Sequence, residues 1–287
     1  MSDLLHLFLG TLWLRPYVFG FLAVYLLAAS RDVGLRRALV FTGWGSVVAF
    51  LAAYSSTRTG IPFGLYHYTQ VTRGQEFYVA NVPIMDSLSF TFLAYASFSL
   101  ARRVLARSRG VRVVLLSGIL MMLLDVVIDP LAVRGDRWFL GRIFFYPEGG
   151  GYFGVPLSNF VGWAVVGWAV VGGYLLLGRS DPAPDPRRLR AGVALYYATL
   201  GFNLLVTWWI GELVLLAAGL LLHAAVSGAL WYCGVIRERP VLSGLQRACW
   251  FLARGAAGPR PITEPSALQR RRGGFGRGAE PPLRAGS

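Results

Sequence analysis

The sequence predicts an all-α membrane protein, a polytopic bundle of about seven transmembrane helices. Composition is the first observation behind this prediction. Of the 287 residues, 55% are hydrophobic and only 15% are charged, whereas about a quarter of the residues of a soluble domain carry a charge. Long apolar stretches are the second, and the placement of the arginines between them is the third. A soluble protein with an unusually apolar core is the alternative, and this composition disfavours it.

Seven apolar segments can be drawn along the chain, each about as long as a helix that crosses a hydrocarbon core of roughly 30 Å. They cover residues 16–29, 38–54, 82–100, 111–133, 157–177, 191–209 and 212–236. The first segment is expected to extend back toward Leu4, with Arg15 either snorkelling to the interface or facing the bundle. On the fifth, Gly162 and Gly167 are small residues that permit close helix packing.

Arginines gather in the connections that follow the first, third, fifth and seventh segments, and the other connections are mixed or acidic. The positive-inside rule then places the N-terminus outside and the C-terminus in the cytoplasm. Because the net charge of +14 lies between apolar runs and in the tail, it does not indicate a nucleic-acid partner. We expect a transmembrane domain over residues 1–253 and a basic, Gly/Pro/Arg-rich, disordered cytoplasmic tail over residues 254–287.

Three aspartates lie inside the predicted spans, where a charged group is costly and therefore informative. Asp125 and Asp129 are four residues apart and share one helix face, and Asp86 begins the third segment. The predicted topology places Asp86 and Asp129 at the same, outer end of the bundle, with Asp125 one turn deeper. Burial beside a like charge favours the protonated form of one carboxyl group, which suits acid–base chemistry. Alternatively, the aspartates cap helix ends or pair with Arg134, Arg137 or Arg142.

Two long outer loops, around residues 60–69 and 146–160, mix aromatic residues, glycines and prolines with few charges. Such loops fit over an apolar cavity better than they fit in water. The two cysteines, Cys233 and Cys249, have neither disulfide-framework nor zinc-site spacing.

These same stretches carry a resemblance to a known family. Residues 60–66 (Gly-Ile-Pro-Phe-Gly-Leu-Tyr), 81–90 (Asn-Val-Pro-Ile-Met-Asp-Ser-Leu-Ser-Phe), 125–132 (Asp-Val-Val-Ile-Asp-Pro-Leu-Ala) and 151–163 resemble the membrane carotenoid-biosynthesis family. That family includes hydratases that act on the 1,2 (1′,2′) double bond of γ-carotene and of bacterioruberin precursors. The resemblance covers roughly residues 15–236.

The resemblance implies acid-catalysed addition of water to the terminal double bond of a carotenoid with an open-chain ψ end, giving a tertiary alcohol. It implies a carotenoid substrate in a bacterial cytoplasmic membrane, with other enzymes of the pathway as partners and no metal, nucleotide or redox cofactor. We expect Asp125 or Asp86 to be the general acid, with the other or Asp129 orienting water or stabilising the cation. The expected substrate contacts are Tyr66, Tyr68, Asn81, Phe90, Tyr95, Glu148, Tyr152 and Asn159.

Three other functions remain compatible with the sequence. A carotenoid cyclase would use the same protonation, and its product would keep the mass of the substrate. A transporter or carotenoid-binding protein could also use intramembrane carboxyl groups, although no internal repeat relates two halves of the chain. A scaffold in a pigment-synthesis complex would need none of the aspartates.

Overall fold

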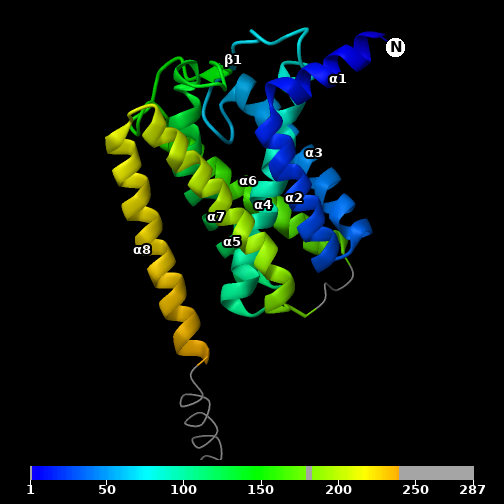
Figure 1. The fold of residues 1–287 in the computed structure, drawn as a ribbon, viewed down its shortest axis with the longest axis vertical. Coiled ribbons are helices and arrows are strands. Elements are labelled where there is room, and N and C mark those ends of the chain that lie inside the picture. Colours follow the sequence, from blue (N-terminus) through cyan, green and yellow to red (C-terminus); the bar gives the residue numbers. More distant parts are fainter. Residues whose placement is uncertain (1, 179–182, 239–287) are drawn as a thin grey trace, which may run out of the picture. The chain divides into compact units, whose positions relative to one another are not determined.

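The computed structural model describes residues 2–178 and 183–238 of the chain. In that part, the chain forms a multi-pass bundle of helices (Figure 1). The helices are α1 (Ser2–Leu14), α2 (Pro16–Asp32), α3 (Leu35–Thr59), α4 (Ile84–Leu105), α5 (Val111–Ala132), α6 (Leu157–Leu177), α7 (Pro186–Trp209) and α8 (Leu213–Glu238). Within the described residues, six helices are long and apolar enough to cross a membrane, and α1 with α2 would make a seventh if they form one bent span.

Each of the seven predicted segments corresponds to one helix; α6 has the predicted bounds, and the other helices differ from the prediction by one to five residues at one end or both. α3, for example, continues to Thr59, and α7 already begins at Pro186. Pro186 occupies the first turn of α7, and the preceding Asp185 accepts a hydrogen bond from the Arg187 backbone amide at 2.8 Å. This is a favourable helix start. The predicted tail, residues 254–287, lies outside the described residues.

The first predicted segment differs from the prediction at its N-terminal end. It does not extend back to Leu4 as one straight helix, because the chain bends by 89° between α1 and α2. Arg15 lies at this bend and is buried, so it faces the bundle rather than snorkelling. Pro16 follows, and its ring is compatible with a first helical position but not with a continuing helix interior.

The helix α4 lies at the centre of the bundle and contacts α2, α3, α5, α6, α7 and α8. It is buried along most of its length, from Phe90 to Arg102. Small residues such as Ala94, Ala96 and Ser97 alternate there with large ones, which allows the surrounding helices to approach closely.

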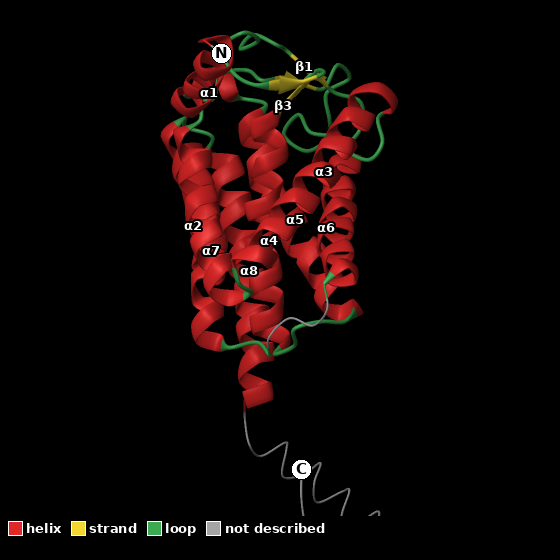
Figure 2. Cartoon of the chain, turned by 90° about the vertical axis from the view of Figure 1, so that its right-hand side faces the viewer, coloured by secondary structure: helices red, strands yellow, loops and turns green. Residues whose placement is uncertain are grey.

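Two loop regions cover the end of the bundle where α4 and α6 begin and α5 ends (Figure 2), and we call this the loop-covered end. The loops pair through short antiparallel strands. β1 (His67–Tyr68) pairs with β4 (Phe144–Phe145), and β2 (Tyr78–Val79) pairs with β3 (Val82–Pro83). A 3₁₀ turn, Gly135–Arg137, lies in the second loop. The β1–β4 ladder ties together two loops that are more than seventy residues apart in the chain.

Glycines on α5 and α6 permit the close helix packing that the sequence predicted for the fifth apolar segment, which forms α6. A Cβ atom at Gly167 would lie 2.8 Å from the Gly118 Cα atom, and one at Gly162 would lie 2.7 Å from the Pro62 carbonyl oxygen. Both distances are below van der Waals contact. Close contact at Gly162 brings the first loop onto the start of α6, directly beside Asn159.

Candidate functional site

Asp125 and Asp129 on α5 are joined by a single amide group from the start of α6. The Asn159 Nδ2 atom donates to Oδ2 of Asp125 at 2.6 Å and to Oδ2 of Asp129 at 2.8 Å. All three side chains are buried. The second oxygen of Asp125, Oδ1, is buried with no hydrogen-bond partner among the described residues. The two carboxyl groups therefore share one amide donor, and no cationic side chain pairs with either of them among the described residues.

Asp86 lies in the first turn of α4 and accepts a hydrogen bond from the Tyr68 hydroxyl group. The Tyr66 and Tyr68 hydroxyl oxygens are 3.2 Å apart. Strand β1 positions this pair because its ladder with β4 holds the loop against the bundle. Burial raises the pKa of the Tyr66 and Tyr68 phenols well above the ordinary value, and the charge of Asp86 adds to both shifts. Both phenols therefore remain protonated, and Tyr68 remains a donor to Asp86.

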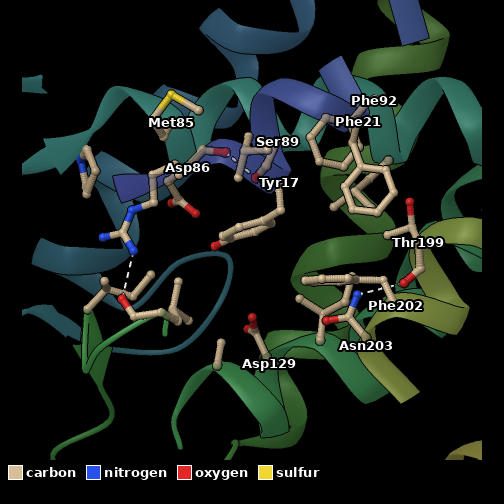
Figure 3. A pocket seen from close by; sticks show the side chains of 18 of the residues that line it. Tyr17, Phe21, Met85, Asp86, Ser89, Phe92, Asp129, Thr199, Phe202 and Asn203 are labelled. Atoms are coloured by element: carbon tan, nitrogen blue, oxygen red, sulfur yellow. Dashed lines mark hydrogen bonds between the residues drawn. The ribbon is translucent and has the colours of Figure 1, made fainter. Parts of the chain in front are cut away.

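A cavity of about 120 Å³ lies among α2, α4, α5, α7 and the covering loops. Its lining is mostly apolar, with Phe21, Phe92 and Phe202 among the aromatic residues. Figure 3 shows Asp86 and Asp129 pointing into this cavity from two different helices. The sequence predicted all three aspartates at the edge of an apolar space, and the structure brings Asp86 and Asp129 there but not Asp125.

A second, smaller cavity of about 30 Å³ shares four lining residues with the first. These are Asp86, Asp129, Phe144 and Trp163. The rest of its wall includes Tyr66, Tyr68, Tyr146 and Asn159, so it is much more polar. A volume of about 10–15 Å³ and two or more polar partners suffice to hold one water molecule. The smaller cavity meets both conditions.

The sequence missed a buried ion pair that lines the larger cavity. Arg15 Nη2 lies 2.9 Å from Oε1 of Glu76, and Arg15 Nη1 donates to the Leu140 carbonyl oxygen at 2.7 Å. Glu76 is 1% exposed and also accepts from the Thr72 hydroxyl group. An arginine within an apolar stretch requires an acidic partner, so Arg15 itself indicated that a buried ion pair would be found. It did not identify Glu76, which lies 61 residues away in a loop.

The expected substrate contacts divide into two groups. Tyr66, Tyr68, Phe90 and Asn159 line the smaller cavity, and Phe90 stacks on Trp163 with ring centroids 4.1 Å apart. The others line neither cavity: Asn81, Tyr95, Glu148 and Tyr152.

These four residues have other surroundings. Asn81 hydrogen-bonds to Thr57 and Arg58. Tyr95 donates to Asp32 near the opposite end of the bundle, and Glu148 is exposed. Tyr152 packs its ring against Phe160. Their presence in the same sequence stretches as the cavity residues did not bring their side chains to the cavities.

The arginines considered as partners for the aspartates have other neighbours. Arg134 and Arg137 pair with Glu212, which lies immediately before α8. The Arg142 guanidinium group lies over the Phe145 ring, 5.5 Å from its centroid. Within residues 2–178 and 183–238, no group of three or more His, Cys, Asp or Glu side chains is arranged to hold a metal ion. The absence of a required cofactor stays a prediction.

Comparison with known protein families gives one match. The family model described as "carotenoid biosynthesis protein" matches residues 14–226. This range includes every helix from α2 to α7, both covering loops and all residues of the two cavities. No curated protein and no solved structure gives a significant match.

Proposed function

The chain belongs to the carotenoid biosynthesis protein family, and from this premise we propose that it hydrates the terminal 1,2 double bond of a ψ-end carotenoid. The product is a tertiary alcohol. Such a substrate is an extended hydrocarbon dissolved in the bilayer, which agrees with a site inside a multi-pass helix bundle. The reaction needs an acid, a place for the apolar end group and a place for water.

The observation that carries this proposal is the pair of adjoining cavities with two carboxyl groups between them. The larger cavity is lined mostly by apolar side chains, and the smaller one has a larger polar share, with hydroxyl, amide and carboxyl groups among its aromatic rings. Asp86 and Asp129 line both cavities. An end group in the larger cavity and a water molecule in the smaller one would therefore meet beside both carboxyl groups. A cyclase has no need for the smaller, polar cavity.

We assign the role of general acid to Asp129. From the sequence, Asp125 or Asp86 was the expected acid, but Asp125 lines neither cavity. Two buried carboxyl groups that share one amide donor favour a single negative charge between them. In this arrangement Asp129 is the member of the pair that can deliver a proton to the end group, because it lines the larger cavity and Asp125 does not. Asn159 fixes the geometry of the pair through its two hydrogen bonds.

Asp86 is the ionised partner and the base that activates water. The Tyr68 hydroxyl group donates to Asp86, and a donor of this kind stabilises a carboxylate. Asp129 transfers its proton to C2 of the substrate, and the electron pair of the double bond forms the new C–H bond. The tertiary cation at C1 is captured by the water oxygen, and Asp86 takes the proton that this water releases. Return of that proton to Asp129 completes the cycle, so the net change is addition of one water.

Aromatic faces next to the carboxyl groups can stabilise the cation. Phe144 and Trp163 line both cavities, and Trp163 is stacked on Phe90. A cation within about 6 Å of an aromatic face gains roughly 0.5–2 kcal/mol, and more where water is excluded. These rings are also apolar, so they form the boundary that keeps the end group and the water in separate cavities until protonation.

Expression in a host that accumulates lycopene or γ-carotene tests the proposal, with pigments analysed by mass spectrometry. The expected result is a new pigment heavier by one water, or by two if both ends react. A new pigment of unchanged mass would show cyclisation instead. An unchanged pigment profile for both substrates, with the protein present in the membrane, would favour a binding or scaffold role.

A further inference from the structure

The larger cavity is too small to hold a whole carotenoid. Its volume is about 120 Å³, and a dry apolar cavity of about 150 Å³ in a protein interior accommodates one benzene molecule. There is room for one isoprene-sized end group beside Asp86 and Asp129. The rest of the polyene must therefore leave the cavity through one of its walls.

The wall between α2 and α7 consists of aromatic rings that are only partly buried. Tyr17 and Phe21 of α2 and Phe202 of α7 all line the cavity. The Tyr17 and Phe202 rings are stacked with centroids 5.4 Å apart, and the Phe21 ring meets Phe202 edge-on at 5.6 Å. Figure 3 shows these three side chains around the cavity. We call this wall the aromatic seam.

The contacts across the seam are made by aromatic rings, whereas hydrogen bonds from tyrosine hydroxyl groups join two neighbouring helix pairs. The Tyr25 hydroxyl group donates to the Ala38 carbonyl oxygen between α2 and α3, and the Tyr196 hydroxyl group donates to the Leu120 carbonyl oxygen between α7 and α5. Beside the seam, the Asn203 amide donates within α7 itself. The rings of Phe21 and Phe202 have no hydrogen-bonding atoms, so their rotation would open the seam without breaking a hydrogen bond.

Further aromatic rings continue from the seam to the protein surface at the margin of the loop-covered end, where Phe139 lies in the second covering loop and Trp209 ends α7. Phe139 is 53% exposed and lies 5.5 Å from the Tyr17 ring and 6.3 Å from the Phe202 ring, centroid to centroid. Trp209 is 63% exposed, and its ring lies 6.4 Å from that of Phe139. An apolar path thus runs from the surface to the two carboxyl groups.

Away from Phe139, polar bonds hold the covering loops in place over the cavity. The buried Arg15–Glu76 pair and the hydrogen bond from Arg15 to Leu140 lie beside the cavity at the loop-covered end. Breaking a buried ion pair costs several kcal/mol. A carotenoid dissolved in the bilayer would also have to leave the lipid to enter through the covering loops, whereas entry between α2 and α7 would not require this.

We infer that the carotenoid enters sideways from the bilayer through the aromatic seam, ψ end first, and that its polyene remains between α2 and α7 against Phe202 during the reaction. This inference rests on the proposed function for the identity of the end group. It makes Phe202 a positioning residue, because it contacts the polyene and not the reacting double bond.

Photo-cross-linking tests the path directly. A phenylalanine that carries a diazirine is placed at Phe202 or Phe139, and the protein is reconstituted in phosphatidylcholine vesicles that contain γ-carotene. Irradiation is expected to give a protein adduct heavier by one carotenoid at both positions. The matched control is Leu205, which lies on the same helix and is 65% exposed. Equal adduct at positions 202 and 205 would contradict the inference, because it would show only contact with dissolved carotenoid.

A kinetic comparison tests the positioning role. In the F202W variant a larger ring occupies the seam, and we expect about a tenfold rise in KM for γ-carotene with kcat changed less than threefold, because overpacking opposes polyene binding. L205W adds the same ring outside the seam and should leave both parameters unchanged. A fall in kcat without a change in KM would contradict the inference.

Failure of the inference and failure of the proposed function give different results. Hydration with an adduct at position 205 equal to that at 202 would refute the seam and leave the hydratase proposal intact. Adducts at positions 202 and 139 without any hydrated product would support the path and refute the reaction.

Discussion

Two of the buried acidic sites in the described part of the bundle differ in what neutralises them. Near the opposite end from the covering loops, Asp32 Oδ2 lies 2.6 Å from Arg102 Nη1 and accepts from the Tyr95 hydroxyl group at 3.0 Å. Near the loop-covered end, Asp125 and Asp129 have one amide donor between them. Both sites are buried, yet only the second borders a cavity.

This difference separates a structural acid from one available for chemistry. A carboxylate paired with arginine has no proton to donate, and it cannot take one up without breaking the pair. An acid that shares its charge with another carboxyl group can gain or lose a proton at little cost.

The largest effect is expected at Asp129. Asp129→Asn keeps the shape of the side chain but removes the acid, so turnover should fall by about 10³–10⁴-fold, near the upper end for general acid catalysis. Product formed per amount of folded protein is the measurement. Asp136→Asn, which changes an exposed carboxyl group in the nearby loop, is the control and should retain full activity. Wild-type turnover in Asp129→Asn would rule out its assigned role.

The opposite result is expected at the Arg102–Asp32 pair. Arg102→Met leaves Asp32 as a buried, unpaired charge and should lower the free energy of unfolding by about 3–5 kcal/mol. Activity per folded molecule should stay near the wild-type value. Thermal unfolding in detergent and specific activity give the two readouts, with the exposed Arg107→Met as control.

The double variant Arg102→Met with Asp32→Asn sharpens this test, because it removes both charges. It should recover much of the lost stability. If it were instead inactive while folded, the pair at this end would belong to the catalytic machinery, and the comparison would be wrong.

A smaller effect is expected at Asn159, which holds the Asp125–Asp129 pair. Asn159→Ala removes two hydrogen bonds to carboxyl groups, each worth roughly 1.5–3 kcal/mol, and turnover should fall by about 10–100-fold. Asn81→Ala is the matched control, because Asn81 lines neither cavity. Equal losses in the two variants would show that the effect is general destabilisation.

The smallest effect concerns alkaline stability of the loop-covered end. Burial, together with the charges of Asp129 and Asp125, raises the pKa of Tyr146 above its ordinary value. In the unfolded chain this tyrosine ionises near pH 10, while in the folded protein it stays protonated. Its contribution to stability is therefore complete below about pH 10 and falls by up to about 1.4 kcal/mol for each further pH unit.

The Tyr146→Phe variant should lose less stability than the wild type between about pH 10 and pH 11, measured by unfolding in mixed micelles. An equal slope for the two proteins would show that Tyr146 ionises alike in both states. That result would show that the Tyr146 hydroxyl group is in contact with bulk water in the folded protein.

Much of the fold could be predicted from the length of the apolar stretches, whereas the cavities could be predicted only in part. A helix that crosses a membrane must be apolar over its whole length, so the seven segments were visible without any knowledge of packing. The aspartates were visible for the converse reason, because a charged group there is rare. Tyr17, Phe21 and Phe202 carry no such signal, since the sequence does not show which apolar residue faces a cavity and which faces lipid.

The bend at Arg15 shows a second kind of limit. Arg15 was expected either to snorkel or to face the bundle, and the choice depended on Glu76, a residue in a loop that folds back over the cavity. Tyr95 and Glu148 illustrate the same limit. Both lie in stretches that also supply cavity residues, but helix geometry and loop path direct them elsewhere.

The most direct test of the central claim uses purified protein in vesicles with γ-carotene and water labelled with heavy oxygen. The account predicts a pigment whose new hydroxyl group carries the label, formed by the wild type and by Asp136→Asn at the same rate and lost in Asp129→Asn. Hydroxyl oxygen taken from molecular oxygen, or labelled product formed at the wild-type rate by Asp129→Asn, would contradict it.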